Sequence, residues 1–567
     1  MKKLTFGTPE ELVPSTYCDG FNYVETEVKY DISKIRAKEN ARGYTLLLPL
    51  DQNEHIYGFG LQLKRMDFKG HKVTVRTNAD PVAPTGDSHA PVPFFVSTAG
   101  YGIYFDTARY AEFDFDAKLT GTAKSTSDKV DTTTDALYDT SKVEAERVCA
   151  VQIPAAKGID IYIIEGETIT DIVAQYNMLA GGGFVPPEWA LGVFYRCCGT
   201  WTQDRVIGIA DYFREKDIPC TILGLEPGWH KRAYSCSFTW RPSNYPDPDS
   251  MIEYLGSKGF HINLWEHAFT HPEAPFYDQI KDKCCDYGVF DGVVPDFGLP
   301  EVRKIFADHH RNNVIKGCID GFKLDECDGS DITGGWSFPN LAEFPSGLDG
   351  ERYHNLFGTL YAKTIMDALD HRPTLCSIRQ AGPLFAQYPF VLYSDLYSHE
   401  DFIRGCVTAG FSGLLWTPEV RDARSAEDMK RRLQNIVFST QCLINAWYCN
   451  EAPWLDLGCE DDVREILKIR EQVIPYLLKA FKNYKEKGIA PMRALVSDYT
   501  NDPETYGIDD QYILGENLIV APIIAGNKGR KVYLPEGEWV DFFTGEKQEC
   551  GWFEVETENI PVYKRVN

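Results

Sequence analysis

The chain has 567 residues, of which 43% are hydrophobic and 25% are charged, a mixture typical of folded globular proteins. A chain this long exceeds one hydrophobic core, so we expect two to four domains. The formal net charge of -25 would repel a phosphate backbone or an anionic lipid surface, which argues against nucleic acid and membrane as partners.

The predicted elements begin with β-strands. Up to about residue 180, short β-rich runs are separated by Gly, Pro, Asp and Asn; among them are GYTLLLPL, KVTVRTN, PFFVSTAGYGIYFD, VCAVQIP and IDIYIIEG. This texture favours an antiparallel β-sandwich, which we assign to residues 1–183. The amino terminus has a basic pair but no apolar run behind it, so we expect no signal peptide.

From about residue 187 to 480, short apolar strands alternate with helical stretches. Strands are predicted at CTILGLEPGW, FHINLWEHAF, IDGFKLDECDG and PFVLYSD, and helices at PDPDSMIEYLGSKG, HNLFGTLYAKTIMDALDH and SAEDMKRRLQNIVFSTQCLI. Strand–helix alternation on this scale predicts a (β/α)₈ barrel, which we assign to residues 184–484. Polar and aromatic residues follow the strands, at the end that carries the active site in such barrels.

After about residue 485 strands return, in APMRALV, QYILGENLIVAPII, RKVYLPEGEWVDFFTG and GWFEVETENIPVYKRVN. They predict a small all-β domain over residues 485–567. The expected fold class is therefore α/β, a (β/α)₈ TIM barrel flanked by an amino-terminal β-sandwich and a small carboxyl-terminal all-β domain.

Two further patterns bear on the environment of the chain. No run of about 18 apolar residues occurs, so we expect no membrane-spanning helix. The 16 cysteines are mostly single and form no CxxC pair. They indicate reduced thiols in a cytoplasmic protein and no zinc site.

Several segments, in order along the chain, resemble glycoside hydrolase family 31. Tyr57-Gly58-Phe59-Gly60 and GYGIYFD resemble its sandwich motifs, and LGVFYRCCGTWTQDRV resembles its first barrel strand. IDGFKLDE resembles its nucleophile segment, SIRQAGPLFAQYPFVLYSD its acid/base segment, and VYLPEGEWVDFFTG its carboxyl-terminal β-domain. The resemblance covers nearly the whole chain. It implies a retaining, exo-acting α-glycosidase that acts on an oligosaccharide or other glycoside and needs no cofactor and no metal.

The resemblance assigns Asp325 as the nucleophile and Asp395 as the general acid/base. A retaining glycosidase needs two carboxyl groups about 5–5.5 Å apart across the scissile bond. Strand alternation places Lys323 on the same face as Asp325, where an ammonium would favour the ionised carboxylate. Asp395 would protonate the leaving oxygen and later activate water.

Other assignments of these carboxylates stay open. Glu326, expected on the opposite face of the strand, and Asp328, beyond its end, are rival nucleophiles. Without the family pattern, Lys323 and Asp325 would be an ordinary ion pair at a strand end, and Asp395 would be the N-cap of a helix.

Further residues are candidates for substrate binding. Arg379 stands where the family has an arginine that contacts sugar hydroxyls, with a structural salt bridge as its alternative role. Glu226 stands where α-glucosidases have an aspartate that holds a distal hydroxyl. Tryptophans after strands stack on sugar faces or belong to the core. The full set is Glu226, Trp229, Trp265, Glu266, Lys323, Arg379, Trp416 and Asn445.

Three positions depart from the α-glucosidase pattern. Lys323 replaces a tryptophan two residues before the nucleophile, Asn445 stands where a substrate-binding histidine is expected, and Glu419 replaces an aspartate. A lysine at the first position resembles α-galactosidases, and its ammonium can donate to an axial hydroxyl and its neighbour. We therefore favour an α-galactoside-type sugar slightly over an α-glucoside.

The alternatives are an α-xyloside or an N-acetylgalactosaminide as substrate, a transglycosylase, and a non-catalytic carbohydrate-binding relative. The last would be expected to lack one of the two carboxylates. The sequence indicates neither the linkage that is cleaved nor the oligomeric state.

Overall fold

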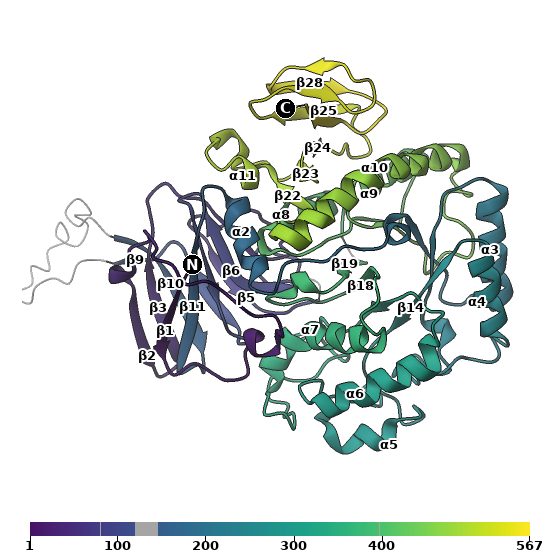
Figure 1. The fold of residues 1–567 in the computed structure, drawn as a ribbon, viewed down its shortest axis with the longest axis horizontal. Coiled ribbons are helices and arrows are strands. Elements are labelled where there is room, and N and C mark those ends of the chain that lie inside the picture. Colours follow the sequence, from purple (N-terminus) through teal and green to yellow (C-terminus); the bar gives the residue numbers. More distant parts are fainter. Residues whose placement is uncertain (80, 120–145, 396, 567) are drawn as a thin grey trace, which may run out of the picture.

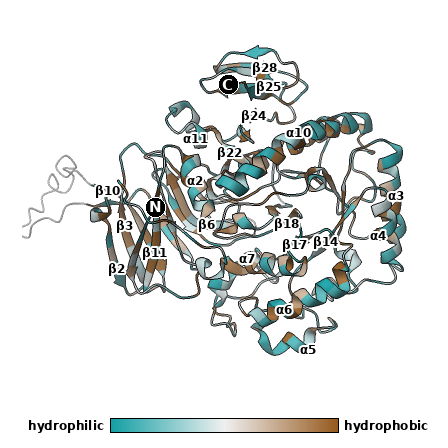
Figure 2. Cartoon of the chain, viewed as in Figure 1, coloured by the Kyte–Doolittle hydropathy of each residue, from teal (hydrophilic) through white to brown (hydrophobic). Residues whose placement is uncertain are grey.

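The computed structural model describes residues 1–79, 81–119, 146–395 and 397–566. Along the chain it forms a two-sheet sandwich, a barrel and a small β-domain (Figure 1). Figure 2 shows hydrophobic residues concentrated on the strands and hydrophilic residues over much of outer helices such as α5 (Tyr277–Ile280).

The amino-terminal part is an antiparallel β-sandwich, as predicted. Its strands are β1 (Lys2–Gly7), β2 (Arg36–Asn40), β3 (Gly43–Pro49), β4 (Ile56–Gly60), β5 (Lys72–Val75), β6 (Pro91–Ser97), β7 (Tyr101–Phe105), β8 (Ala111–Asp114), β9 (Lys118–Leu119), β10 (Glu146–Pro154) and β11 (Gly158–Glu165). One sheet has the order β1-β11-β7-β6-β4, and the other has the order β2-β3-β10-β8-β5, with β9 beside β10. Alternate residues such as Phe95, Phe113 and Val151 fill the core between the sheets.

A helix that the strand pattern did not predict, α2 (Ile169–Met178), follows the sandwich. Thr168 and Asp171 form a reciprocal capping box at its start, with hydrogen bonds of 2.9 and 3.1 Å. Its Tyr176 stacks on Phe94 of β6, and the Tyr176 hydroxyl accepts a hydrogen bond from the Leu384 amide at 3.0 Å. Helix α2 therefore joins the sandwich to the barrel.

The central part is a (β/α)₈ barrel, which confirms the predicted fold. Its parallel strands are β12 (Val193–Arg196), β13 (Ile222–Leu225), β14 (His261–Glu266), β17 (Gly321–Leu324), β18 (Cys376–Ile378), β19 (Phe390–Leu392), β20 (Glu419–Val420) and β21 (Cys442–Asn445). The order is β19-β18-β17-β14-β13-β12-β21-β20, so the last strand returns beside the first. A parallel bridge between Leu392 and Trp416 joins the two remaining edges and closes the barrel.

Helices surround this barrel (Figure 1). They are α3 (Gln203–Glu215), α4 (Pro248–Ser257), α6 (Pro300–His309), α7 (Gly350–Ala368), α8 (His399–Thr408), α9 (Ala426–Val437) and α10 (Glu460–Lys487). A hairpin of β15 (Cys284–Val289) and β16 (Gly292–Pro295) lies in the long connection after β14. No helix in the described ranges is both long and apolar enough to cross a membrane.

The helix predicted over SAEDMKRRLQNIVFSTQCLI is shorter in the structure. Helix α9 ends at Val437, and Cys442 begins strand β21. Arg470 on α10 donates hydrogen bonds to the carbonyls of Val437, Ser439 and Thr440 at 2.9, 2.6 and 3.3 Å. Carbonyls at a helix end need partners from outside the helix. A buried guanidinium supplies them here, from a part of the chain that the local pattern does not include.

The carboxyl-terminal part is a small β-domain, as predicted. Its strands are β22 (Met492–Ala494), β23 (Tyr512–Leu514), β24 (Leu518–Val520), β25 (Gly529–Leu534), β26 (Trp539–Asp541), β27 (Lys547–Gln548), β28 (Gly551–Glu556) and β29 (Val562–Arg565). A single helical turn, α11 (Leu495–Asp498), follows β22. The predicted domain boundaries after residues 183 and 484 stay predictions, and α10 continues to Lys487.

Candidate active site

Polar side chains gather where the barrel strands end at their carboxyl termini. Asp325 directly follows β17, Arg379 directly follows β18, and Asp395 comes just after β19. In a barrel these strand ends meet at one face, which is where the loops build the active site. The residues at this face include Arg196, Glu226, Trp265, Lys323, Asp325, Arg379, Asp395, Glu419 and Asn445.

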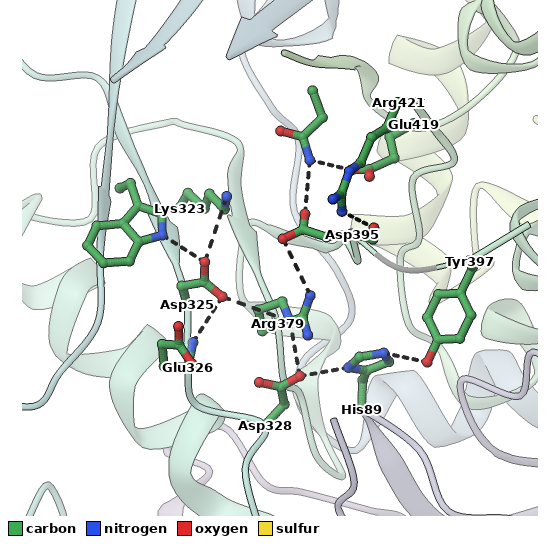
Figure 3. A network of polar contacts seen from close by, with 12 residues as sticks. His89, Lys323, Asp325, Glu326, Asp328, Arg379, Asp395, Tyr397, Glu419 and Arg421 are labelled. Atoms are coloured by element: carbon green, nitrogen blue, oxygen red, sulfur yellow. Dashed lines mark hydrogen bonds and ion pairs between the residues drawn. The ribbon is translucent and has the colours of Figure 1, made fainter. Parts of the chain in front are cut away.

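Asp325 is held by donors on both carboxylate oxygens (Figure 3). The Trp265 indole donates to Oδ2 at 2.7 Å, and the Glu326 amide donates to Oδ1 at 3.0 Å. The Lys323 ammonium lies 3.7 Å from Oδ2. Burial alone would raise the pKa of Asp325, but the charges of Lys323 and Arg379 and the indole hydrogen bond hold that pKa below its usual value. Asp325 is therefore a carboxylate at neutral pH, as a nucleophile must be.

Arg379 lies between Asp325 and Asp395 (Figure 3). Its Nε is 3.9 Å from Asp325 Oδ1, and its Nη1 is 4.0 Å from Asp395 Oδ2. Nε also donates to Asp328 Oδ2 at 3.0 Å, so the structural salt bridge considered as an alternative role is present as well. One guanidinium thus spans both catalytic candidates and is anchored by a third carboxylate.

Asp395 is the more accessible of the two carboxylates, with 21% of its side chain exposed against 14% for Asp325. Asn445 donates from Nδ2 to Asp395 Oδ1 at 2.9 Å. Arg421 donates to the backbone carbonyl of Asp395. Ser398, not Asp395, is the N-cap of helix α8, so the helix-cap alternative for Asp395 is wrong.

A buried ion-pair cluster lies beside Asp325. Lys323 Nζ is 3.0 Å from Glu226 Oε2, and Arg196 Nη1 is 3.1 Å from Glu226 Oε1. The ring of Tyr393 lies beneath both cations, 4.9 Å from Lys323 Nζ and 5.4 Å from the Arg196 guanidinium carbon. Arg196 Nε and Nη2 are buried without a hydrogen-bond partner among the described residues. They can donate to a polar ligand.

The two rival carboxylates occupy different places from Asp325. Glu326 does not point to the opposite face of β17, because the strand ends at Leu324 and Glu326 has a φ of 54°. Burial, and then the charges of Asp325 and Asp328, raise the pKa of Glu326, so its carboxyl group is a poor nucleophile near neutrality. Asp328 has no exposed side-chain surface and is bonded to Arg379 and His89.

Three predicted substrate-binding residues belong to the core instead. Trp229 and Trp416 have no exposed surface, and their indoles donate to the carbonyls of Trp265 and Phe402 at 2.7 and 3.0 Å. A fully buried ring offers no face to a sugar. Glu266 accepts hydrogen bonds from Tyr361 and His310. Its neighbour in β14, Trp265, contacts Asp325, so strand alternation directs Glu266 outward to the helices.

Trp265 reaches the site through its indole Nε1, while its ring is only 1% exposed. Its part in the site is therefore a hydrogen bond to Asp325 and not a stacking surface.

Residues outside the predicted set also contribute. His89 comes from the sandwich and contacts Asp328 and Tyr397 at 2.8 and 2.7 Å. Glu419 accepts a hydrogen bond from Asn445 at 3.1 Å, and burial followed by the charge of Asp395 raises the pKa of Glu419 to about 8. The sequence marked Glu419 only as a departure from the family pattern, where an aspartate is usual. Nothing local marked His89, because its partners lie in another domain.

A cavity of about 690 Å³ opens beside Asp395. The amino-terminal ends of α8 and α9 and the segment 524–526 of the carboxyl-terminal domain line it. Within the part of the chain that the structure describes, no three His, Cys, Asp or Glu side chains are grouped to hold a metal ion.

Comparison with known proteins agrees with this fold. Residues 183–480 match the family description "Glycosyl hydrolases family 31 TIM-barrel domain". The chain belongs to glycoside hydrolase family 31. Residues 23–114 match the family's N-terminal galactose mutarotase-like domain, and residues 488–567 match its C-terminal domain. The chain is therefore a glycoside hydrolase with the three-part architecture of this family.

Several curated relatives are α-glycosidases by name, and one, of Sporosarcina globispora, is named an isomaltosyltransferase. An α-xylosidase of Emericella nidulans is 23% identical over 92% of this chain and 68% of its own length. "Alpha-glucosidase 2" of Bacillus thermoamyloliquefaciens is 26% identical over 91% of this chain and 67% of its own. The names support the coarse function of a retaining α-glycosidase and do not specify an α-galactoside.

Solved structures share the fold. A family GH31 dextranase of Flavobacterium johnsoniae, complexed with glucose, has a TM-score of 0.78 at 22% identity, covering 93% of this chain and 67% of its own. A GH31 α-xylosidase from a soil metagenome, complexed with xylose, has a TM-score of 0.77 at 21% identity, covering 94% and 81%.

Proposed function

We propose that this family 31 enzyme is an exo-acting α-glycosidase that works with retention, with Asp325 as nucleophile and Asp395 as general acid/base. The observation that carries the proposal is the guanidinium of Arg379, which lies 3.9 Å from one carboxylate and 4.0 Å from the other. The shared guanidinium supports a common site for the two carboxyl groups, and retention is what the family pattern implies for that pair.

In the first step, the ionised Asp325 attacks the anomeric carbon while Asp395 gives its proton to the leaving oxygen. The bond to the aglycone breaks, and a β-linked glycosyl ester forms on Asp325. Lys323, Arg379 and Trp265 favour the charged nucleophile before attack.

In the second step, Asp395 takes a proton from water, and the water oxygen displaces Asp325 from the anomeric carbon. Two inversions give a product with the α-configuration of the substrate. We propose that the aglycone departs through the cavity that Asp395 lines. Asn445 and Arg421 hold the acid/base by its carboxylate and its backbone carbonyl.

For the sugar, we favour an α-galactoside type. An ammonium has three donors, and Lys323 uses one on Glu226 at 3.0 Å. The remaining donors can serve an axial hydroxyl and its neighbour. The unpartnered Nε and Nη2 of Arg196 add further donors beside the same pair. An α-xyloside or α-glucoside is the second candidate, because the names of the relatives favour it.

The test is a set of aryl α-glycosides that differ only in the sugar: galactose, glucose, xylose and N-acetylgalactosamine. The proposal predicts the highest kcat/KM with the galactoside. A tenfold higher value with another sugar would reject the sugar assignment and keep the reaction. Hydrolysis of none would reject the reaction itself. Products longer than the substrate would identify a transglycosylase.

A further inference from the structure

A histidine of the sandwich domain reaches both catalytic loops (Figure 3). His89 precedes β6 and is only 1% exposed. Its Nδ1 lies 2.8 Å from Asp328 Oδ2, and its Nε2 lies 2.7 Å from the Tyr397 hydroxyl. Asp328 follows the nucleophile in the loop after β17, and Tyr397 follows the acid/base in the loop after β19. One imidazole therefore bonds to two loops that belong to different strands.

The chemistry of Asp328 orients the imidazole. Although burial opposes it, Arg379 and His89 hold the pKa of Asp328 below its usual value, so this side chain is a carboxylate. A carboxylate only accepts hydrogen bonds, and Nδ1 of His89 must donate to it. The other ring nitrogen then faces the Tyr397 hydroxyl. Each end of the ring has its own partner, and the ring cannot turn without losing both.

The contact reaches the reacting groups through Arg379. Asp328 accepts the Nε hydrogen of Arg379 at 3.0 Å, and that guanidinium spans Asp325 and Asp395. A shift of His89 would therefore move the anchor of Arg379 on one side and the acid/base loop on the other. The separation of the two carboxyl groups determines whether a double displacement can occur. A misplacement of about 1 Å can lower a rate by about 100-fold.

We propose that His89 is a positioning residue that holds the nucleophile loop and the acid/base loop at their working separation. The sandwich domain is then a part of the catalytic unit. This inference rests on the proposed roles of Asp325 and Asp395. The energetic coupling between His89 and Tyr397 does not depend on those roles and can be tested separately.

A purely structural role would be to dock the sandwich on the barrel. The chain offers a matched control for that role. Thr77 is a fully buried sandwich residue whose hydroxyl donates to Asn355 Oδ1 on helix α7 at 2.6 Å. Thr77→Val removes a buried hydrogen bond between the same two parts without touching either catalytic loop.

The kinetic test compares two substrates with the same sugar, one with an alkyl leaving group and one with an aryl oxide of low pKa. The alkyl group needs a proton from Asp395 in order to leave, and the aryl oxide does not. His89→Ala is expected to lower kcat for the alkyl glycoside at least tenfold more than for the aryl glycoside. Tyr397→Phe is expected to shift the ratio in the same direction, and Thr77→Val to leave it unchanged.

Two conservative variants test the geometry. The amide of His89→Gln reaches toward Tyr397, and the shorter amide of His89→Asn reaches toward Asp328. Tyr397 lies in the loop of the acid/base, on which the alkyl leaving group depends. The glutamine variant should therefore retain more activity on the alkyl glycoside than the asparagine variant. Equal losses on both substrates in His89→Ala, or a ratio that Thr77→Val changes as much, would overturn the proposal.

Urea unfolding of the single and double variants at His89 and Tyr397 separates this inference from the proposed function. Non-additive losses in the free energy of unfolding support the contact. Additive losses overturn the inference even in an active enzyme. If the unsubstituted chain cleaves no α-glycoside, the proposed function fails. The additivity of the losses in the free energy of unfolding then decides by itself whether His89 and Tyr397 are coupled. If His89→Ala does not fold, Tyr397→Phe carries the kinetic test, and an unchanged ratio there overturns the inference.

Discussion

The Lys323 ammonium lies 3.7 Å from Asp325 Oδ2 at the end of one barrel strand. Only 2% of the lysine side chain and 14% of the aspartate side chain are exposed, so water screens their attraction little. Glu226 binds the same ammonium at 3.0 Å and keeps it in place. The pair explains how a buried carboxylate stays ionised.

Replacing Lys323 should therefore change the pH dependence of the reaction. In the proposed mechanism, activity needs ionised Asp325, and Lys323 lowers the pKa of that group. In Lys323→Met the pKa rises, so the acidic limb of kcat/KM should move to higher pH, by about 1 to 3 units. The measurement is a pH profile of kcat/KM with an activated aryl glycoside.

The control for this profile is Lys304→Met. Lys304 pairs with Asp308 on helix α6 and is 75% exposed. Loss of this surface pair should leave the limb unchanged. An acidic limb that stays in place in Lys323→Met would show that Lys323 does not set the charge of the nucleophile.

Glu419 should make the stability of the chain depend on pH. Its folded pKa is raised to about 8 from a usual value of 4.5, so only the folded chain keeps this proton between those values. The stability that this group contributes is complete below pH 4.5 and is lost as pH rises toward 8. Glu419→Gln cannot titrate. The free energy of unfolding of Glu419→Gln, minus that of the unsubstituted chain, should therefore gain about 1.4 kcal/mol for each pH unit between pH 5 and 8.

Urea titrations of both proteins at pH 5, 6.5 and 8 measure this gain. Groups other than Glu419 titrate in both proteins, and their contributions cancel in the difference. A difference that is the same at all three pH values would mean that Glu419 is not held protonated.

The two tryptophans Trp416 and Trp265 should behave differently. Trp416→Ala leaves a cavity in the core, so the free energy of unfolding should fall by about 3–5 kcal/mol, with KM of the folded enzyme unchanged. Trp265→Phe removes the hydrogen bond to Asp325, worth about 1.5–3 kcal/mol, so kcat/KM should fall about 10- to 100-fold. Thermal unfolding and steady-state kinetics measure both. A raised KM in Trp416→Ala would show instead that the Trp416 ring contacts the sugar.

The barrel and both β-domains could be predicted because their patterns are local. Alternation in β3 and apolar runs such as β13 indicate strands without reference to the rest of the chain. The end of α9 could not be predicted, because the donor that terminates it is Arg470 on another helix. Helix α2 had a local cue in Thr168 and Asp171, but the surrounding strands suggested an all-β region.

The position of a side chain could be predicted where strand alternation determines it, whereas the roles of Asp325 and Asp395 came from the family resemblance and stay predictions. Lys323 and Asp325 lie together because a strand alternates. The same alternation turns the side chain of Glu266 away from the site and toward His310. Only the register of the strand in the structure reveals this direction. The partners of His89 lie in loops that are distant in sequence, so no pattern around His89 indicates them.

The measurement that tests the central assignment most directly is the anomer of the glycosyl azide formed by each carboxylate variant. The substrate is an aryl α-glycoside of the preferred sugar with a leaving group of low pKa. Asp395→Ala can still form the β-linked ester on Asp325, and azide then displaces it to give the α-glycosyl azide. Asp325→Ala forms no ester, so azide attacks the substrate directly and gives the β-glycosyl azide. NMR of the products should show these two anomers, and Lys323→Ala in the Asp395→Ala background should still give the α-azide. The opposite pattern, or loss of activity in Glu326→Gln or Asp328→Asn but not in Asp325→Ala, would contradict the assignment.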